Sequence, residues 1–157
     1  MNKIIVVIAA HPDDEVIGCG GTIARMVKDQ HKVWGYVASS SSYRSLDNKI
    51  QRSSEIAEKE GRDAAKLLGY ELSFDQYETT KLKHNDNLIN RLETMILDNN
   101  IDLVFTHWTN DLTEDHRAVA EATAIAARKG TSVLMYRSNF YKFNKPFSPS
   151  VYIDISP

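Results

Sequence analysis

The chain has 157 residues, of which 42% are hydrophobic and 25% are charged, a balance typical of one globular domain. Its formal net charge of -2 gives no general electrostatic reason to bind nucleic acid or an anionic membrane, and a small neutral partner fits it. No apolar stretch approaches the roughly 20 residues of a membrane span. The single cysteine, Cys19, excludes an internal disulfide and favours a reducing compartment, so we expect a cytoplasmic protein.

The first apolar run, residues 3–9, is rich in Ile and Val and lacks polar alternation, which is typical of a strand covered on both faces. It is followed by His11-Pro12-Asp13-Asp14, which does not resemble the small-residue cleavage region of a signal peptide. Helical and strand-like patterns then alternate along the chain. We expect strands at 3–9, 31–38, 71–77, 101–106, 133–137 and 151–155. We expect helices at 15–28, 49–68, 87–97 and 115–128, and a serine-rich loop at 39–47.

Strands that alternate with helices predict a mostly parallel sheet covered on both faces, a three-layer αβα, Rossmann-like fold that would span residues 1–157 as one domain. Ligands of such sheets gather beyond the carboxyl ends of the strands, above all where the strand order reverses. Two loops in that location carry unusual residues, since His11 to Glu15 follows the first strand and His107 to His116 follows a later one. We therefore expect the fold to bring these two loops together.

His11, Asp14 and His116 form a set of two imidazoles and one carboxylate, which can hold Zn²⁺ while leaving a position for water. The same donors also accept Fe²⁺, Co²⁺ and other divalent ions. Asp13 is adjacent to Asp14, and in a turn one carboxylate can face the metal while the other faces the water. Asp13 is therefore the candidate general base.

Each of these motifs also has a purely structural interpretation. The segment from Pro12 to Glu15 is how an ordinary helix begins, with proline in the first turn and acids near the positive end of the helix dipole. A histidine such as His116 near a helix start is often incidental, but the two loops together favour a metal site. The run from Gly18 to Gly21 indicates either a helix packed closely on the sheet or a ligand near its backbone, and we favour packing.

Two distant segments match the pattern of one known family. The first is Ala10-His11-Pro12-Asp13-Asp14-Glu15 followed by Gly18-Cys19-Gly20-Gly21-Thr22, and the second runs from Thr106 to Val119 and includes Asp115-His116-Arg117. Together they resemble the PIG-L/LmbE family of metal-dependent N-acetyl-sugar deacetylases. Weaker similarity at 64–69 and 147–155 extends the resemblance over nearly the whole chain.

The resemblance implies that His11, Asp14 and His116 bind zinc and that Asp13 is the base that activates the attacking water. It implies an enzyme that removes the N-acetyl group from an N-acetylglucosamine-type sugar or glycoconjugate, releasing acetate and a free amine. The expected partner is thus a small sugar or glycoconjugate rather than nucleic acid.

One position departs from the family pattern. Many members carry a second histidine three residues before the last ligand, thought to stabilise the tetrahedral oxyanion, and this chain has Thr113 there. Thr113 is either a neutral donor to that oxyanion or the N-cap of the following helix, and we favour the cap. His107 is a candidate replacement donor or a partner behind the ligands. Asp115 either orients a neighbouring group or favours the helix start.

Two arginines are candidate substrate-binding residues. Arg44 and Arg52 could contact hydroxyls or phosphates, and the loop at 39–47 would line the pocket. Family members usually continue beyond the equivalent of Asp154 to Ser156 into a further helix and tail, so the resemblance predicts a short or truncated domain.

Two other functions are compatible with parts of the sequence. A module that keeps the metal and sugar pocket but has little or no turnover would explain Thr113 and the short C-terminus. Asp13 and Asp14 after a first strand also occur in Mg²⁺-binding receiver domains of signalling proteins. His11 in that environment, and the lack of a convincing phosphoacceptor Asp after a later strand, argue against the receiver interpretation.

Overall fold

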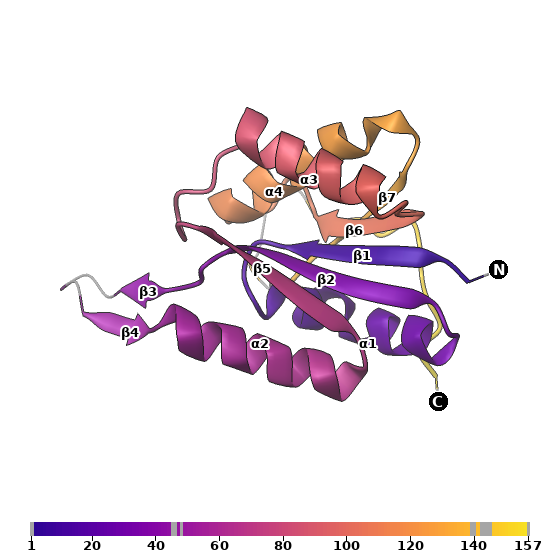
Figure 1. Cartoon of the computed structure of the whole chain (residues 1–157), viewed down its shortest axis with the longest axis horizontal. Coiled ribbons are helices and arrows are strands. Elements are labelled where there is room, and N and C mark those ends of the chain that lie inside the picture. The colour runs from indigo at the N-terminus through magenta and orange to yellow at the C-terminus, as the bar shows by residue number, and fades with distance from the viewer. Residues whose placement is uncertain (1, 45–46, 48, 139–140, 142–145, 157) are drawn as a thin grey trace.

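The computed structural model describes residues 2–44, 47, 49–138, 141 and 146–156. At its centre is a five-stranded sheet in which all neighbouring strands are parallel, in the order β5-β2-β1-β6-β7. The order of the strands reverses between β1 and β6, so the loops that follow these two strands lie side by side. The strands are β1 (Ile4–Ala9), β2 (Lys32–Ser39), β5 (Glu71–Tyr77), β6 (Leu103–His107) and β7 (Ser132–Tyr136) (Figure 1).

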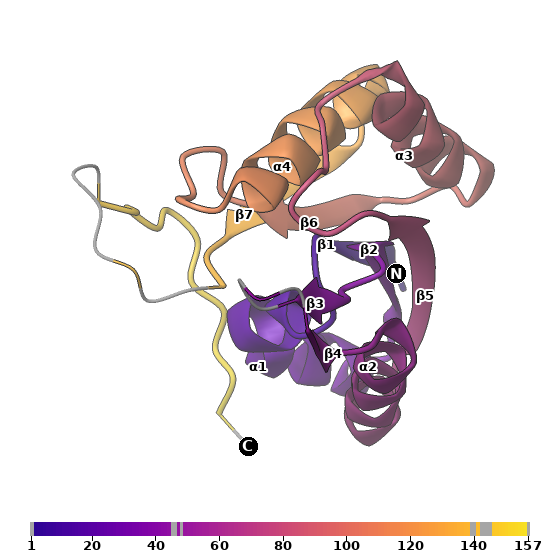
Figure 2. The same ribbon diagram turned by 90° about the vertical axis from the view of Figure 1, so that its left-hand side faces the viewer.

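Helices cover both faces of the sheet (Figure 2). On one face lie α1 (Asp14–Lys28) and α2 (Ser54–Leu68), and on the other lie α3 (Asp86–Asp98) and α4 (Glu114–Ala126), which continues into a 3-10 turn. A small antiparallel hairpin of β3 (Tyr43–Arg44) and β4 (Ile50–Arg52) stands apart from the sheet. The three-layer parallel α/β fold expected from the sequence is confirmed.

The central strand β1 is buried on both faces, as the continuous apolar run in its sequence predicts. Every residue from Ile5 to Ala9 is at most 1% exposed, because helices cover both of its faces. Alternate side chains of β1 enter two separate cores. Val6 and Ile8 pack in the core that contains Leu88, Leu92 and Val119, whereas Ile5 and Val7 pack in the core that contains Ile23 and Ala65.

The helix expected at 49–68 begins later than the sequence pattern predicted. α2 starts at Ser54, and Oγ of the N-cap residue Ser53 accepts a hydrogen bond from the N–H of Ile56 at 3.4 Å. A serine in this role favours a helix start, and the chain before it pairs with β3 as β4. The expected loop at 39–47 accordingly contains β3. Gly69 ends α2 in the left-handed region, which favours glycine.

No strand forms at 151–155, where the sequence pattern predicted a final one. The segment runs beside α1 instead, with Ile153 packed against the core under α1 and Ile155 in contact with Gly21. Tyr152 points away and is 80% exposed. The alternation of apolar residues here reflects contacts with a helix rather than pairing within the sheet.

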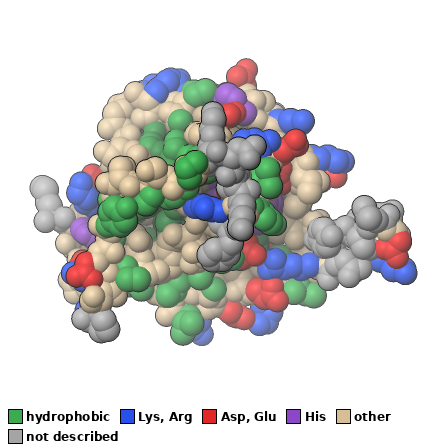
Figure 3. Space-filling view, turned by 180° about the vertical axis from the view of Figure 1, so that it is seen from behind, with side chains coloured by type: hydrophobic (Ala, Val, Ile, Leu, Met, Phe, Trp, Pro, Cys, Tyr) green, Lys and Arg blue, Asp and Glu red, His purple; other side chains and the backbone are tan. Residues whose placement is uncertain are grey.

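Surface charge agrees with the small net charge of the chain. On the face shown in Figure 3, basic and acidic side chains are interspersed and do not gather into one patch of a single sign. Within the described residues, no helix is both long enough and apolar enough to cross a membrane.

Two of the glycines near the start of α1 lie in close contact with other parts of the chain. A Cβ on Gly18 would overlap the ring of Tyr136, and a Cβ on Gly21 would lie 2.7 Å from Cδ1 of Ile155. Tyr136 is held in place because its ring is buried and its hydroxyl donates to the main-chain oxygen of Ile8 at 3.0 Å. The packing interpretation is therefore confirmed at Gly18, whereas at Gly21 the neighbouring atom is the end of the exposed Ile155 side chain, which can move aside.

This contact predicts opposite effects for two neighbouring glycines. We expect Gly18→Ala to lower the free energy of unfolding by about 1–3 kcal/mol, because the methyl group overpacks against a fixed ring. Gly20→Ala should raise it by about 0.5–1 kcal/mol, because alanine is the better helix former and its Cβ would meet only an ordinary contact 3.5 Å away. Urea unfolding measures both, and equal effects would contradict the packing argument.

Candidate metal centre

The turn after β1 carries the first group of candidate residues. The N–H of Asp13 donates to the carbonyl of His11 at 3.0 Å, and the N–H of His11 donates to Oδ2 of Asp14 at 2.9 Å. Helix α1 then begins at Asp14. The two aspartates therefore lie at the N-terminal end of a helix, where the helix dipole stabilises negative charge.

Asp14 lies at the centre of the site and is 5% exposed. Its Oδ2 lies 3.2 Å from Nδ1 of His11 and 3.2 Å from Nε2 of His116, and these two nitrogens are 3.3 Å apart. Its Oδ1 accepts a hydrogen bond from Oγ of Ser138 at 2.8 Å. Segments that follow β1, β6 and β7 thus meet at one carboxylate.

The triangle of two nitrogens and one oxygen fits a divalent metal ion. Nε2 of His11 lies 3.0 Å from Oδ2 of Asp115, and Nδ1 of His116 faces Oδ1 of Asp111 at 3.4 Å. In the neutral rings these acceptors favour a proton on Nε2 of His11 and on Nδ1 of His116. Nδ1 of His11 and Nε2 of His116 then present lone pairs beside the Asp14 carboxylate. Zinc ligands at about 2.0–2.1 Å lie roughly 3.3–3.4 Å apart at the tetrahedral angle, which matches the observed spacing.

The ionisation of these groups reflects the same convergence. Burial by itself lowers the pKa of His11, but Asp115 and Asp14 outweigh burial and raise the pKa to about 9. Burial also lowers the pKa of His116, and Asp111 and Asp14 raise it to about 9. Burial raises the pKa of Asp14, but the surrounding histidines hold it well below its usual range. Metal binding at these residues would therefore displace protons.

Asp115 contacts a candidate ligand directly. Besides Nε2 of His11, its carboxylate accepts hydrogen bonds from the N–H of Thr80 at 2.7 Å and from the N–H of Leu82 at 3.2 Å. Thr80 has a φ of 67°, a left-handed conformation that is unusual for a β-branched residue. The same carboxylate thus orients His11 and holds the turn that follows β5.

His107 lies behind the triangle. Its ring is 0% exposed and stacks on the ring of His116, with the centroids 3.9 Å apart and the planes inclined by 14°. Its Nε2 accepts the N–H of Ala10 at 3.0 Å, and burial lowers its pKa. This position favours a supporting role over contact with a substrate oxyanion.

Thr113 occupies the N-cap position of α4, but its side chain makes no capping hydrogen bond. The predicted N-cap position is therefore confirmed, although the hydroxyl makes no bond to the start of the helix. The nearby acceptor is Oδ1 of Asp111, which takes the N–H of Thr113 at 2.8 Å. An aspartate that accepts a main-chain N–H two residues onward stabilises the turn locally.

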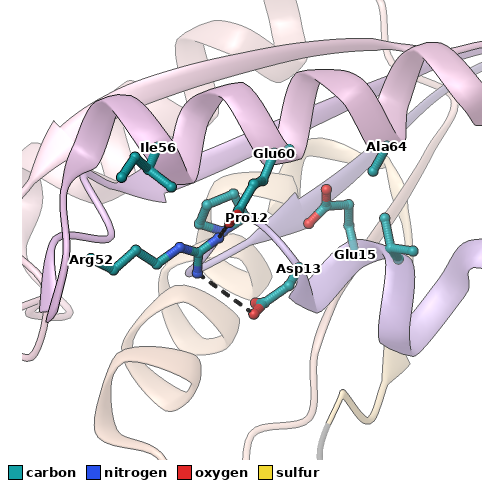
Figure 4. Close-up of a pocket in the computed structure, with 9 residues that line it drawn as sticks. Pro12, Asp13, Glu15, Arg52, Ile56, Glu60 and Ala64 are labelled. Atoms are coloured by element: carbon teal, nitrogen blue, oxygen red, sulfur yellow. Dashed lines mark hydrogen bonds and ion pairs between the residues drawn. The ribbon is translucent and has the colours of Figure 1, made fainter.

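Asp13 lies beside the triangle with its side chain 52% exposed. Partial burial and the charge of Asp14 raise its pKa. Nη1 of Arg52 is 4.0 Å from Oδ2 of Asp13, and Nη2 of Arg52 bonds Oε2 of Glu60 at 2.7 Å (Figure 4). Of the two candidate arginines, Arg52 thus lies next to Asp13, whereas Arg44 belongs to β3 and its side chain lies outside the described part of the structure.

Sequence reasoning missed several residues that the fold places here. Ser138 comes directly after the expected strand at 133–137, so its place at the same sheet edge could have indicated it. Glu15 is 0% exposed and receives the hydroxyl of Tyr70 at 2.9 Å. Its pKa is raised to about 7, mainly by burial and further by the charges of Asp14 and Asp13. No sequence pattern indicated Tyr70, or Glu60 as the partner of Arg52.

Fold and site together define a parallel α/β protein whose sheet carries, at the reversal of its strand order, two histidines and an aspartate that could hold one metal ion. A family model described as "PIG-L: GlcNAc-PI de-N-acetylase" matches residues 6–127. The chain belongs to this PIG-L family, so the resemblance found in the sequence is confirmed.

Similar proteins agree with this assignment. The Escherichia coli (strain K12) protein "Uncharacterized deacetylase YaiS" is 31% identical over 144 residues, which cover 87% of this chain and 74% of that protein. The structure of the conserved protein TT1542 from Thermus thermophilus has a TM-score of 0.74 at 22% identity, over 96% of this chain and 70% of that one. The N,N'-diacetylchitobiose deacetylase from Pyrococcus horikoshii has a TM-score of 0.70 at 21% identity, over 85% and 60% of the two chains. The last two similarities concern the fold.

The geometry of the triangle predicts which histidine controls metal content. Loss of a residue that only supports a metal ligand typically lowers metal affinity by about 10–100-fold. We expect His116→Ala to lower zinc affinity by more than this, because the change removes one of three converging donors. Equilibrium dialysis followed by elemental analysis measures the bound zinc. His84→Ala is the matched control, since His84 pairs with Glu121 on the surface. Equal zinc content in the two variants would mean that His116 is not a ligand.

Proposed function

We propose that the protein is a zinc-dependent N-deacetylase that removes the acetyl group from an N-acetylglucosamine-type sugar or glycoconjugate. The observation that carries this proposal is the convergence of donor atoms from His11, Asp14 and His116 beside the half-exposed carboxylate of Asp13. Membership of the PIG-L family supports amide hydrolysis, and the similarity to a diacetylchitobiose deacetylase supports a sugar substrate.

His11, Asp14 and His116 would hold the metal ion, and their own partners would keep the three side chains in place. Two imidazoles and one carboxylate suit zinc and leave room for other ligands. A divalent cation at this position supplies the Lewis acidity that activates water and polarises an amide carbonyl. Asp115 orients the ring of His11, and Ser138 fixes the second oxygen of Asp14.

Asp13 is the proposed general base. Its side chain is 52% exposed, which gives it access to water, and it lies beside the three candidate ligands. It takes one proton from the water that attacks the acetyl carbonyl. When the C–N bond of the tetrahedral intermediate breaks, the same carboxylic acid gives this proton to the leaving nitrogen. One water is consumed for each acetate and amine released, and Asp13 returns to its ionised form.

Arg52 is proposed to position the substrate. Its guanidinium is tied to Glu60 on one side and lies 4.0 Å from Asp13 on the other, so its donors are held near the reacting amide. Arg44, on the neighbouring hairpin, remains a second candidate. The hydroxyl of Thr113 is a candidate donor to the oxyanion, weaker than the charged histidine of many family members.

Thr113 also motivates a second candidate function, a module that binds metal and sugar with little or no turnover. Such a module would keep the three ligands and the pocket but lack a charged oxyanion donor. It differs from the enzyme in one measurable respect, because it would bind zinc in stoichiometric amount without releasing acetate.

The role of Asp13 predicts a separation between metal binding and catalysis. We expect Asp13→Asn to lower acetate release from N-acetylglucosamine derivatives by about 10²–10⁴-fold while zinc content is retained, because the amide cannot accept the proton. Acetate is measured enzymatically and zinc by elemental analysis in the same preparation.

Asp63→Asn is the matched control, because Asp63 is an exposed residue of α2 that pairs with Lys59. It should release acetate at the rate of the unchanged protein. Zinc-loaded protein that releases no acetate from any of the derivatives would support the binding module. An Asp13→Asn variant with full activity would rule out Asp13 as the base.

A further inference from the structure

A pocket lies between the start of α1 and α2 (Figure 4). Its volume is about 540 Å³, which lies within the range of about 300–1,000 Å³ typical of small-molecule sites. Pro12 and Asp13 before α1, with Glu15 and Val16 in its first turn, form one side, and α2 with the preceding Arg52 forms the other. Asp13, which lies beside the candidate ligands, also lines this pocket, so the pocket adjoins the candidate centre.

The pocket contains a buried carboxyl group with one unsatisfied oxygen. Glu15 is 0% exposed, and Figure 4 shows its carboxyl pointing into the space between the two helices. Oε1 accepts the hydroxyl of Tyr70 at 2.9 Å, but no donor among the described residues reaches Oε2. Because a buried acceptor without a donor is unfavourable, a ligand that brings a hydroxyl to this point would be stabilised.

The walls of the pocket suit a ring with an apolar face. Pro12 lines it from the turn before α1 and Val16 from α1, and Ile56 and Ala64 line it from α2. Ile56 is 53% exposed, so part of this apolar surface is open. Gly61 allows α2 to approach, because a Cβ there would lie 3.0 Å from Cβ of Pro12. A pyranose ring presents C–H groups on its faces and hydroxyls at its edge, which matches apolar walls around a polar group.

The charges of the pocket select against an anion. Three carboxyl groups, those of Asp13, Glu15 and Glu60, line it together with one guanidinium, that of Arg52. The guanidinium is already bonded to Glu60. A phosphate or carboxylate would therefore meet more negative than positive charge, whereas neutral hydroxyls can donate to the acids and accept from Arg52.

We propose that this pocket is a subsite for a second, neutral sugar unit, the one joined to the sugar whose acetyl group is removed, and that Glu15 accepts one of its hydroxyls. The inference rests on the proposed function, because it takes the substrate to be a sugar. A longer acyl chain is a poorer occupant, since it would leave Oε2 of Glu15 without a donor. The enzyme is thereby expected to prefer disaccharides or larger glycoconjugates to a single N-acetylated sugar.

Kinetics with matched substrates test the subsite. We expect kcat/KM for N,N'-diacetylchitobiose to exceed that for N-acetylglucosamine by about tenfold or more, mainly through KM. Ala64→Leu should remove most of this ratio, because the larger side chain fills the pocket away from Asp13 and Arg52. Ala24→Leu, an exposed position on α1, introduces the same residue elsewhere and should leave the ratio unchanged.

A binding measurement makes the test independent of turnover. Cellobiose has no amide to hydrolyse, and we expect it to shift the main-chain amide resonances of Gly61 and Ala64 in the zinc-loaded, ¹⁵N-labelled protein. Methyl β-glucoside, a single ring, should shift them less at the same concentration. The same titration on the Ala64→Leu variant should show no response at Gly61.

The outcomes separate this inference from the proposed function. Acetate release with equal kcat/KM for one and two sugar units, together with unchanged amides, would overturn the subsite and leave the deacetylase intact. Shifts at Gly61 and Ala64 without any acetate release would support the subsite and contradict the deacetylase. A preference for N-octanoylglucosamine over N-acetylglucosamine that is lost in Ala64→Leu would assign the pocket to an acyl chain and overturn the proposal.

Discussion

The organisation of this site depends on one buried carboxylate that three separate segments share. Asp14 faces a histidine from the turn after β1, a histidine from α4 and the hydroxyl of Ser138 after β7. A carboxylate in this position is unfavourable unless opposite charges and donors surround it, and no single segment supplies enough of them. The contacts that stabilise the buried Asp14 carboxylate therefore hold together the segments that meet at the reversal of the strand order.

The fold could be predicted because strands buried on both faces have continuous apolar sequences that are easy to recognise. Strands such as β1 and β6 read as continuous apolar runs, and α3 places its apolar residues at helical spacing. The prediction failed where a local pattern had two possible tertiary partners. The apolar alternation at 151–155 could serve a strand or a segment along a helix, and only the position of α1 decides between them. The start of α2 was misjudged because β4 precedes its N-cap directly.

The site was predictable to the extent that its residues lie in short motifs after strands. His11, Asp14 and His116 do converge, because parallel strands bring their carboxyl ends to one edge of the sheet. The hydrogen-bond partners in and around the site were harder to predict from the sequence. Ser138 is 124 residues from Asp14, and Tyr70 is 55 residues from Glu15, so each contact depends on the register of distant elements. Thr113 does occupy the predicted N-cap position of α4, but the sequence could not show that its hydroxyl makes no capping bond.

The turn held by Asp115 places a constraint on chain length rather than on side-chain identity. Its bonds reach the main chain of Thr80 and Leu82, and the Thr80 side chain points outward to solvent. Replacements that preserve the number of residues between β5 and α3 therefore leave the anchor intact, even where the side chains differ widely. An insertion or deletion in that connection would shift the N–H groups out of register and release the carboxylate that sets the ring of His11. Variation among relatives in the length of this connection, more than in its composition, would thus mark those in which the histidine equivalent to His11 is held differently.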